Sequence, residues 1–365
     1  MSVEKKQILE ILSNLRVPST NESLISNKVL DTIVVDNKNI SINLKVQNPT
    51  LQIRKKLEKN VINKVQEKFT NYNILVNVVS QSKSKNSLHN IKNIIAVASG
   101  KGGVGKSTIS SNLAVSLAQE GYAVGLLDGD IYGPSIPLMF DAENSKPKLV
   151  NIEGKSLMEP IVSYGVKLLS IGFFSDPNDP IVWRGPMASK ALNQMIHQSN
   201  WGDLDYLIVD LPPGTGDIHL SLVQSLPLTG SIIVTTPQPV SIIDAKKAIS
   251  MFQLKTINVP VIGIVENMSW FEIEDSQKKY YIFGRNGGEL LSENLKIPFL
   301  GKVPLKESIR ESGDIGRPAF LQAKQDKARH FKEITENVIN KTNERNISLA
   351  PTEKVKITHA KGCSS

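Results

Sequence analysis

The chain has 365 residues, a formal net charge of +8 and a single cysteine, Cys363. This length allows two domains with cores of their own, and one cysteine excludes a disulfide within the chain. The excess of lysine is spread along the sequence without a basic face or aromatic partners, so we expect no nucleic-acid function. Because no signal sequence follows Met1 and no apolar run could span a bilayer, we expect a cytoplasmic protein with no membrane role.

The first 80 residues show the apolar spacings of a small α+β domain. Ile8, Ile11 and Leu15 recur at helical intervals, and the stretch 40–46 alternates apolar and polar residues as a strand does. The polar residues 36–39 suit a hairpin turn. We therefore expect a helix over 4–15, strands over 29–36 and 40–46, a helix over 57–69 and a strand over 74–79, which form domain 1–80 and lead into a linker over 81–93.

Beyond the linker, short apolar runs alternate with helical patterns up to residue 342, and a polar tail follows over 343–365. Such alternation predicts an α/β domain over 94–342 with a doubly wound, mostly parallel sheet. In these sheets ligands bind at the carboxyl ends of the strands. The expected strands are 94–98, 123–127, 166–171, 206–209, 232–235 and 261–265.

A phosphate loop joins the first of these strands to a helix. The run from Gly100 to Ser107 has the spacing G-x-x-x-x-G-K-S, in which glycines aim backbone N–H groups at a triphosphate. Lys106 can reach the β- and γ-phosphates, and the Ser107 hydroxyl can ligate Mg²⁺. The residues expected to bind ATP here are Gly100, Lys101, Gly102, Gly103, Val104, Gly105, Lys106, Ser107 and Thr108.

Polar residues at the ends of other strands complete the predicted site. Asp128 and Asp210 each follow an apolar run, and with Ser107 they form the expected Mg²⁺ site. Gly214 can donate its N–H to the γ-phosphate. Asn267 carries both a donor and an acceptor, and we expect it to read the adenine edge.

Lys101 is a second lysine that an ordinary phosphate loop does not need. The run 101–108 (KGGVGKST) resembles the deviant phosphate loop of the MinD/ParA-like ATPases. This resemblance implies a homodimer in which Lys101 reaches the partner's nucleotide, and it implies that Asp130 activates the attacking water. The catalytic residues would then be Lys101, Lys106 and Asp130.

Further motifs narrow the resemblance to the Mrp-type iron–sulfur cluster carrier ATPases. They are WRGPM (183–187), DLPPGTGD (210–217), TPQ (236–238), ENMS (266–269), FGRNGG (283–288) and SGDIGRP (312–318). The resemblance implies Mg²⁺-dependent ATP hydrolysis, transfer of iron–sulfur clusters to apoprotein clients and contact with scaffold proteins. The domain over 1–80 resembles the small domain that precedes the ATPase in this family.

One departure from the family pattern concerns thiolates, the preferred ligands of iron–sulfur clusters. Members that bind a cluster carry Cys-x-x-Cys after the segment matching Trp270, whereas residues 272–279 here include no cysteine. Cys363 from each subunit is the best remaining cluster ligand. The alternatives are an ATP-driven adaptor that holds no cluster, a MinD/ParA-like positioning ATPase, and a small-molecule kinase or ligase.

Overall fold

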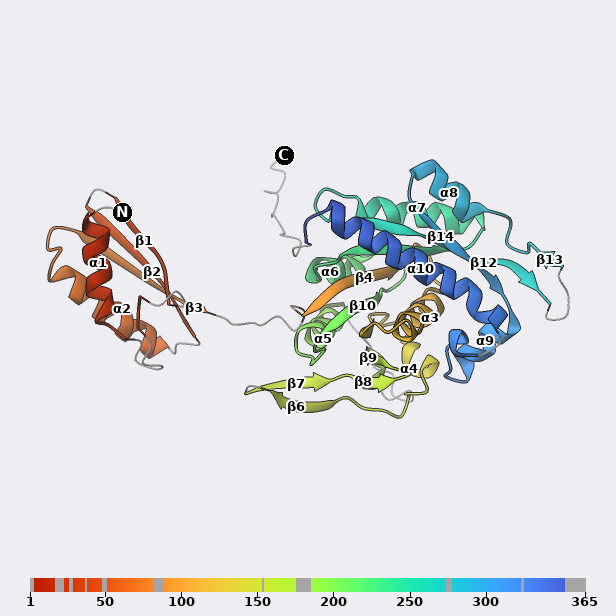
Figure 1. The fold of residues 1–365 in the computed structure, drawn as a ribbon, viewed down its shortest axis with the longest axis horizontal. Coiled ribbons are helices and arrows are strands. Elements are labelled where there is room, and N and C mark those ends of the chain that lie inside the picture. The colour runs from red at the N-terminus through yellow and green to blue at the C-terminus, as the bar shows by residue number, and fades with distance from the viewer. Residues whose placement is uncertain are drawn as a thin grey trace. The chain divides into compact units, whose positions relative to one another are not determined.

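The computed structural model describes residues 3–16, 23–25, 29–36, 38–47, 51–81, 88, 90–152, 154–174, 185–273, 278–322 and 325–351. Within these residues the chain forms two compact units, 1–86 and 87–365 (Figure 1). The predicted cluster ligand Cys363 lies outside the described residues. No described helix is long and apolar enough to cross a membrane.

The first unit is a three-stranded sheet with two helices. Its elements are α1 (Val3–Ser13), β1 (Leu30–Asp36), β2 (Asn39–Gln47), α2 (Leu51–Gln66) and β3 (Asn73–Gln81). The strands lie in the order β1-β2-β3, with β1 antiparallel and β3 parallel to β2. Asp36 pairs with Asn39, which confirms the hairpin, and Ile40, Ile42 and Leu44 of β2 are fully buried. The alternation over 40–46 therefore marked the core face of this strand.

The second unit is built on a nine-stranded sheet of the described residues, in the order β13-β12-β11-β4-β10-β5-β9-β8, with β14 also paired to β12. Strands β13 and β8 pair antiparallel at its two ends, and the other pairs are parallel. The strands are β4 (Ile91–Ala98), β5 (Val124–Asp128), β8 (Ile161–Ser163), β9 (Val166–Ser170), β10 (Leu204–Asp210), β11 (Gly230–Thr235), β12 (Val261–Glu272), β13 (Lys279–Tyr280) and β14 (Phe299–Leu305).

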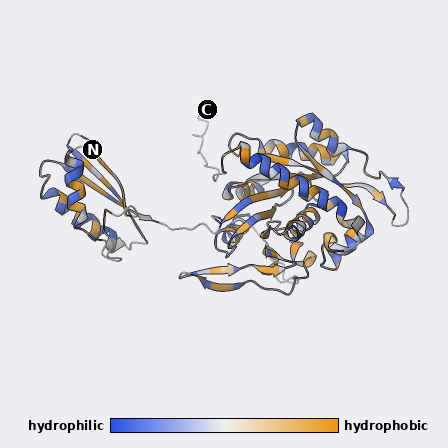
Figure 2. Ribbon diagram, viewed as in Figure 1, coloured by the Kyte–Doolittle hydropathy of each residue, from blue (hydrophilic) through white to orange (hydrophobic). Residues whose placement is uncertain are grey.

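Helices cover both faces of this sheet. In β4, Ile94, Ala96 and Ala98 face one core, while Ile95 and Val97 face the other. The first core includes α5 (Gly185–His197), α6 (Asp217–Ser225), α7 (Pro239–Phe252) and α8 (Gly287–Leu295), and the second includes α3 (Lys106–Gln119), α4 (Ile136–Met139) and α10 (Gln325–Ser348). Figure 2 shows the central strands as mostly hydrophobic and α10 as largely hydrophilic on its outer side. The predicted doubly wound, mostly parallel sheet is confirmed.

Some elements differ from the sequence prediction. Strand β4 begins at Ile91, three residues early, because its first residues pair with β10. The hairpin of β6 (Lys148–Ile152) and β7 (Lys155–Glu159) and the strand β14 were not predicted. Most β6 and β7 residues are exposed, so an apolar period was missing there. The remaining elements are η1 (Ile171–Phe174), α9 (Glu307–Asp314) and η2 (Ala319–Leu321).

Candidate nucleotide-binding site

The phosphate loop lies between the end of β4 and the start of α3, and two of its glycines have no room for a side chain. Gly105 precedes α3 in the left-handed region, at φ 82°. A Cβ atom there would lie 2.2 Å from Asn267 Nδ2. At Gly100, a Cβ would lie 2.1 Å from the backbone carbonyl of Asp244 in α7. The loop is therefore packed directly against β12 on one side and α7 on the other.

Lys106 lies in a buried cluster with two carboxylates. Its Nζ is 2.8 Å from Asp210 Oδ2 and 3.6 Å from Asp130 Oδ2. Its side chain is 6 % exposed, and that of Asp210 is fully buried. Burial opposes the charge on Lys106, yet the Asp210 and Asp130 carboxylates outweigh it and raise the pKa of this ammonium group. The lysine is therefore charged at neutral pH.

Two serines hold the carboxylate of Asp210 in place. Ser107 Oγ donates to Oδ2 at 2.6 Å, and Ser110 Oγ donates to Oδ1 at 2.7 Å. The hydroxyl of Ser107 and the carboxylate of Asp210 are thus adjacent, and their binding of Mg²⁺ stays a prediction. Ser110 was not singled out, because a serine one helical turn after the loop carries no signal by itself.

Asp128 ends β5 directly beside Asp210, with which it pairs in register. It is fully buried and accepts bonds from Ser170 Oγ at 2.8 Å and from the Asp130 N–H at 3.1 Å. Burial and the negative charge of Asp210 raise the pKa of Asp128 to about 7. Burial also raises the pKa of Asp130, against the opposing charge of Lys106. Hard oxygen donors of this kind fit Mg²⁺, which binds carboxylates, hydroxyls and substrate phosphates.

The other loop residues take different positions. Lys101, Gly102 and Gly103 are exposed, Val104 is buried, and Thr108 is half-buried at the start of α3. Within the described part of the chain, the Lys101 ammonium group makes no ion pair. Lys101 is therefore exposed, whereas Lys106 is buried against Asp210.

The loop after β10 is tied to the phosphate loop and to α6. Gly214 N–H donates to Ser99 O at 2.9 Å. His219 of α6 is buried, with its Nδ1 3.0 Å from Pro212 O, and burial lowers the pKa of this imidazole. A neutral His219 therefore donates to Pro212 and anchors the loop. Sequence reasoning missed this residue, whose role depends on the fold of the loop.

Asn267 lies beside the phosphate loop, one residue beyond the part of β12 that pairs with β11. Its Nδ2 donates to Val104 O at 2.8 Å, so the amide supports the loop. The neighbouring Glu266 is buried and accepts the Gly288 N–H at 2.7 Å, at the start of α8. The predicted contact of Asn267 with adenine stays a prediction.

Residues 90–339 match the family described as ParA, NUBPL iron-transfer P-loop NTPase. The chain belongs to this family. It is 41 % identical over 321 residues to an iron-sulfur cluster carrier protein of Synechocystis, covering 86 % of this chain and 90 % of that protein. An iron-sulfur cluster carrier protein of Escherichia coli K12 is 50 % identical over 247 residues, covering 67 % of this chain and 66 % of that protein.

A solved nucleotide-binding protein of Archaeoglobus fulgidus in complex with ADP has a TM-score of 0.58 and 36 % identity. The likeness covers 68 % of this chain and 95 % of that protein. The resemblance predicted from the loop and the six motifs is therefore confirmed at the level of the family, and the chain is a P-loop NTPase.

In this member of the NUBPL iron-transfer family, the described side chains near the end of β12 offer oxygen and nitrogen atoms, and not sulfur, as possible metal ligands. Glu272 accepts Trp270 Nε1 at 3.2 Å and lies 3.2 Å from Lys306 Nζ, while Lys279 Nζ lies 4.0 Å from the centre of the Trp270 ring. Among the described residues, no group of three or more His, Cys, Asp and Glu side chains could hold a metal ion. These side chains do not supply the thiolates that an iron–sulfur cluster prefers.

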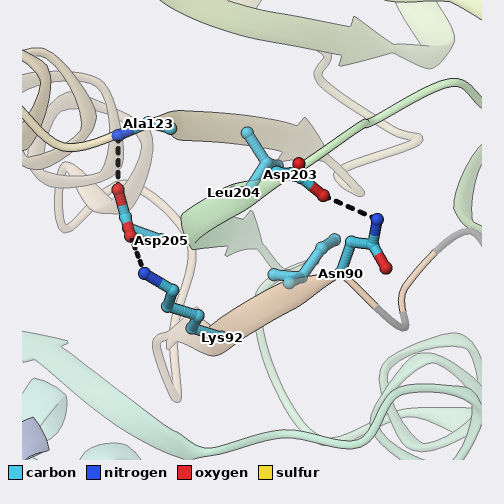
Figure 3. Close-up of a pocket in the computed structure, with 7 residues that line it drawn as sticks. Asn90, Lys92, Ala123, Asp203, Leu204 and Asp205 are labelled. Carbon is cyan, nitrogen blue, oxygen red and sulfur yellow. Dashed lines mark hydrogen bonds and ion pairs between the residues drawn. The ribbon is translucent and has the colours of Figure 1, made fainter.

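A separate pocket of this NTPase opens at the amino ends of β4 and β10 (Figure 3). Its volume is about 520 Å³. Lys92 Nζ is 2.8 Å from Asp205 Oδ1, the Ala123 N–H donates to Asp205 Oδ2 at 2.8 Å, and Asn90 donates to Asp203 at 2.6 Å. These groups use their hydrogen-bonding capacity on one another, at the edge of the sheet opposite the phosphate loop. We therefore infer that they hold neighbouring strands together and do not bind a ligand.

Proposed function

We propose that this chain is an ATP-hydrolysing carrier of iron–sulfur clusters that delivers them to apoproteins. The observation that carries the proposal is the match to the Synechocystis carrier protein, which covers 86 % of this chain. Residues 87–365 make up about three quarters of the chain, so this match reaches into residues 1–86 as well. At least part of the small unit is therefore shared with the Synechocystis carrier protein. A positioning ATPase or a small-molecule kinase would not require such a unit.

The buried cluster suits ATP hydrolysis. The N–H groups of the phosphate loop and Lys106 would bind the phosphates, and Mg²⁺, with Ser107, Asp210 and Asp128 around it, would supply charge neutralisation. Asp130, which is 14 % exposed and lies 3.6 Å from Lys106 Nζ, would accept a proton from the attacking water, as the family resemblance implies. Gly214 lies on the loop that can respond to loss of the γ-phosphate.

Lys101 suits a role across a homodimer. Its side chain is exposed while Lys106 occupies its own phosphate site. We expect Lys101→Ala to lower ATP turnover without weakening nucleotide binding. Mixing Lys101→Ala with Lys106→Ala subunits would leave at most one complete site in each mixed dimer. A chain that stays monomeric at every ATP concentration, with full activity of Lys101→Ala, would contradict this assignment.

Anaerobic reconstitution tests the carrier function. Wild type and Cys363→Ser are loaded with iron and sulfide, and bound iron, sulfide and visible absorbance are compared, followed by transfer to an apo-ferredoxin with and without Mg·ATP. We expect a cluster in wild type, a loss in Cys363→Ser, and faster transfer with ATP. Equal cluster content in both proteins would eliminate Cys363 as a ligand.

The adaptor without a cluster is the second candidate, because the chain offers one cysteine where a cluster takes four thiolates. Absence of a cluster from both proteins, together with ATP-dependent binding to an apoprotein, would favour the adaptor over the carrier.

A further inference from the structure

Helix α7 has an apolar outer face. The exposed side of a surface helix is ordinarily polar. In α7, however, Val240 is 58 % exposed and Ile243 is 59 % exposed, and Leu254, just beyond the helix end, is 52 % exposed. Val240 and Ile243 lie one turn apart, and Leu254 follows about four turns after Val240. These side chains therefore form an apolar stripe that Lys246, Lys247 and Ser250 interrupt between Ile243 and Leu254, and no described element covers it.

A groove runs between this stripe and α6. Its volume is about 620 Å³, and its apolar lining comes from Leu220 of α6 with Ile243, Met251 and Leu254. Two helices form its walls, and an amphipathic helix with apolar residues three and four positions apart is the usual occupant of such a groove. The shape and lining thus suit a third helix laid between α6 and α7.

Lysines edge the groove. Lys246 and Lys247 both line it, and Lys255 is exposed just beyond α7. Lys247 pairs with Asp244 at 3.1 Å, while Lys246 and Lys255 make no ion pair with the described residues. This edge therefore attracts an acidic partner. A second copy of the chain placed by two-fold symmetry would bring the same lysines together, which like-charge repulsion disfavours.

The groove is connected to the phosphate site through both of its walls. Asp244 of α7 contacts Gly100, where a Cβ would lie 2.1 Å from the Asp244 backbone. Thr215, which lines the groove, directly follows Gly214, whose N–H bonds to Ser99 O. Movement of either loop on loss of the γ-phosphate would change the groove.

We propose that the groove between α6 and α7 docks an acidic amphipathic helix of a partner protein, and that the bound nucleotide changes its affinity. The nucleotide dependence rests on the proposed function, whereas the docking site does not. The expected partner is a protein segment whose apolar face contacts Ile243 and whose carboxylates pair with Lys246.

Two synthetic peptides of roughly 18 residues test the groove, since shorter isolated helices are marginal. Both carry leucines at helical spacing; one has glutamates and the other lysines at the remaining positions. Binding to the full chain is measured by fluorescence anisotropy with Mg·ADP and with a non-hydrolysable ATP analogue. We expect the acidic peptide to bind at least about tenfold more tightly than the basic one, with different affinities in the two nucleotide states.

Substitutions locate the contact. Ile243→Glu should weaken the acidic peptide at least about tenfold, and Lys246→Glu with Lys247→Glu should reverse the preference between the peptides. Leu290→Glu, at a leucine of α8 that is 54 % exposed, is the matched control and should leave binding unchanged. ATP turnover, measured on the same samples, should stay at the wild-type level in all of these variants.

Equal affinity for the two peptides, or binding insensitive to Ile243→Glu, would overturn the docking site. Equal affinity in both nucleotide states would overturn its nucleotide dependence alone. If Ile243→Glu abolished ATP-dependent dimerisation, the groove would belong to the contact between copies instead. A wild-type chain that binds the acidic peptide but hydrolyses no ATP would support docking and contradict the proposed ATPase.

Discussion

A lysine–aspartate ion pair lies at each end of β10, and the two pairs differ in their exposure to water. Lys92 and Asp205 approach to 2.8 Å at the amino end, and Lys106 and Asp210 approach to 2.8 Å at the carboxyl end. The first pair is open to water, with side chains 75 % and 27 % exposed, whereas the second is almost fully buried. An exposed pair contributes little, while a buried one holds charges that lose their compensation when one partner is removed. The two pairs therefore differ in burial and not in distance.

The carboxyl groups near these pairs titrate in opposite directions. Hydrogen bonds from Lys92 and from the Ala123 N–H lower the pKa of Asp205. Burial and the charge of Asp210 raise the pKa of Asp128 to about 7. Crowded, dehydrated carboxylates are costly unless a cation joins them, and within the chain Lys106 supplies that cation.

The largest expected effect is that of Lys106→Ala, which removes the buried lysine at the carboxyl end of β10. We expect ATP turnover to fall about 1,000-fold and nucleotide binding to weaken, because the phosphates lose their buried cation. The matched variant Lys92→Ala removes the exposed lysine at the other end of β10, and its turnover should stay within about twofold of wild type. Steady-state hydrolysis and nucleotide titration measure both. Similar losses in the two variants would contradict the assignment of the carboxyl end.

Asp130→Ala should lower turnover about 100-fold while leaving nucleotide affinity within about threefold of wild type. The reason is that Asp130 lies 3.6 Å from Lys106 and does not belong to the phosphate loop. Single-turnover hydrolysis and equilibrium binding separate the two effects. Wild-type turnover in Asp130→Ala would remove it from the reaction.

The pH dependence of stability should differ between the two ends. Between pH 3.8, its ordinary pKa, and about pH 7, Asp128 is protonated in the folded chain and ionised in the unfolded chain. The raised pKa of Asp128 therefore adds to the free energy of unfolding at low pH, and this contribution is lost as the pH rises toward 7. Asp205 has the opposite sign, and its contribution is lost only as pH falls below 3.8.

Thermal unfolding of Asp128→Asn and Asp205→Asn, without nucleotide, tests these signs. From about pH 5 to about pH 8, the Tm of Asp128→Asn should rise relative to wild type by on the order of 5 °C, while the difference for Asp205→Asn stays constant. Parallel curves for Asp128→Asn and wild type would contradict the raised pKa.

The smallest expected effect concerns stability in Lys92→Ala. Its ammonium group is open to water, so the urea midpoint should match that of wild type. Any residual difference should vanish in about 1 M NaCl, where the Debye length is about 3 Å. A large change that persists in salt would show that the pocket at the amino end does more than pair strands.

The contiguous parts of the site could be predicted from the sequence, and the parts contributed by neighbouring elements could not. The loop spacing and a strand-end aspartate such as Asp210 depend on local order and on the rule that parallel strands end at one edge. Ser170 bonds to Asp128 only because β9 lies beside β5, and the sequence does not state which strands are neighbours. The bond from the Asn267 amide to Val104 O likewise depends on β12 lying beside the phosphate loop, and the contact of Asn267 with adenine stays a prediction.

Helix α10 is synthesised after the strands that it covers. Phe331, Ile334 and Val338 are buried against the face of the sheet that α3 also covers. This helix packs on β12, β14 and α3, and about 70 residues separate Val261 at the start of β12 from Phe331. At about 5–20 residues per second, β12 waits roughly 4–14 seconds for this cover, while residues 1–86 are already complete. The newly made chain therefore exposes the apolar residues of β12 and β14 on this face until α10 emerges.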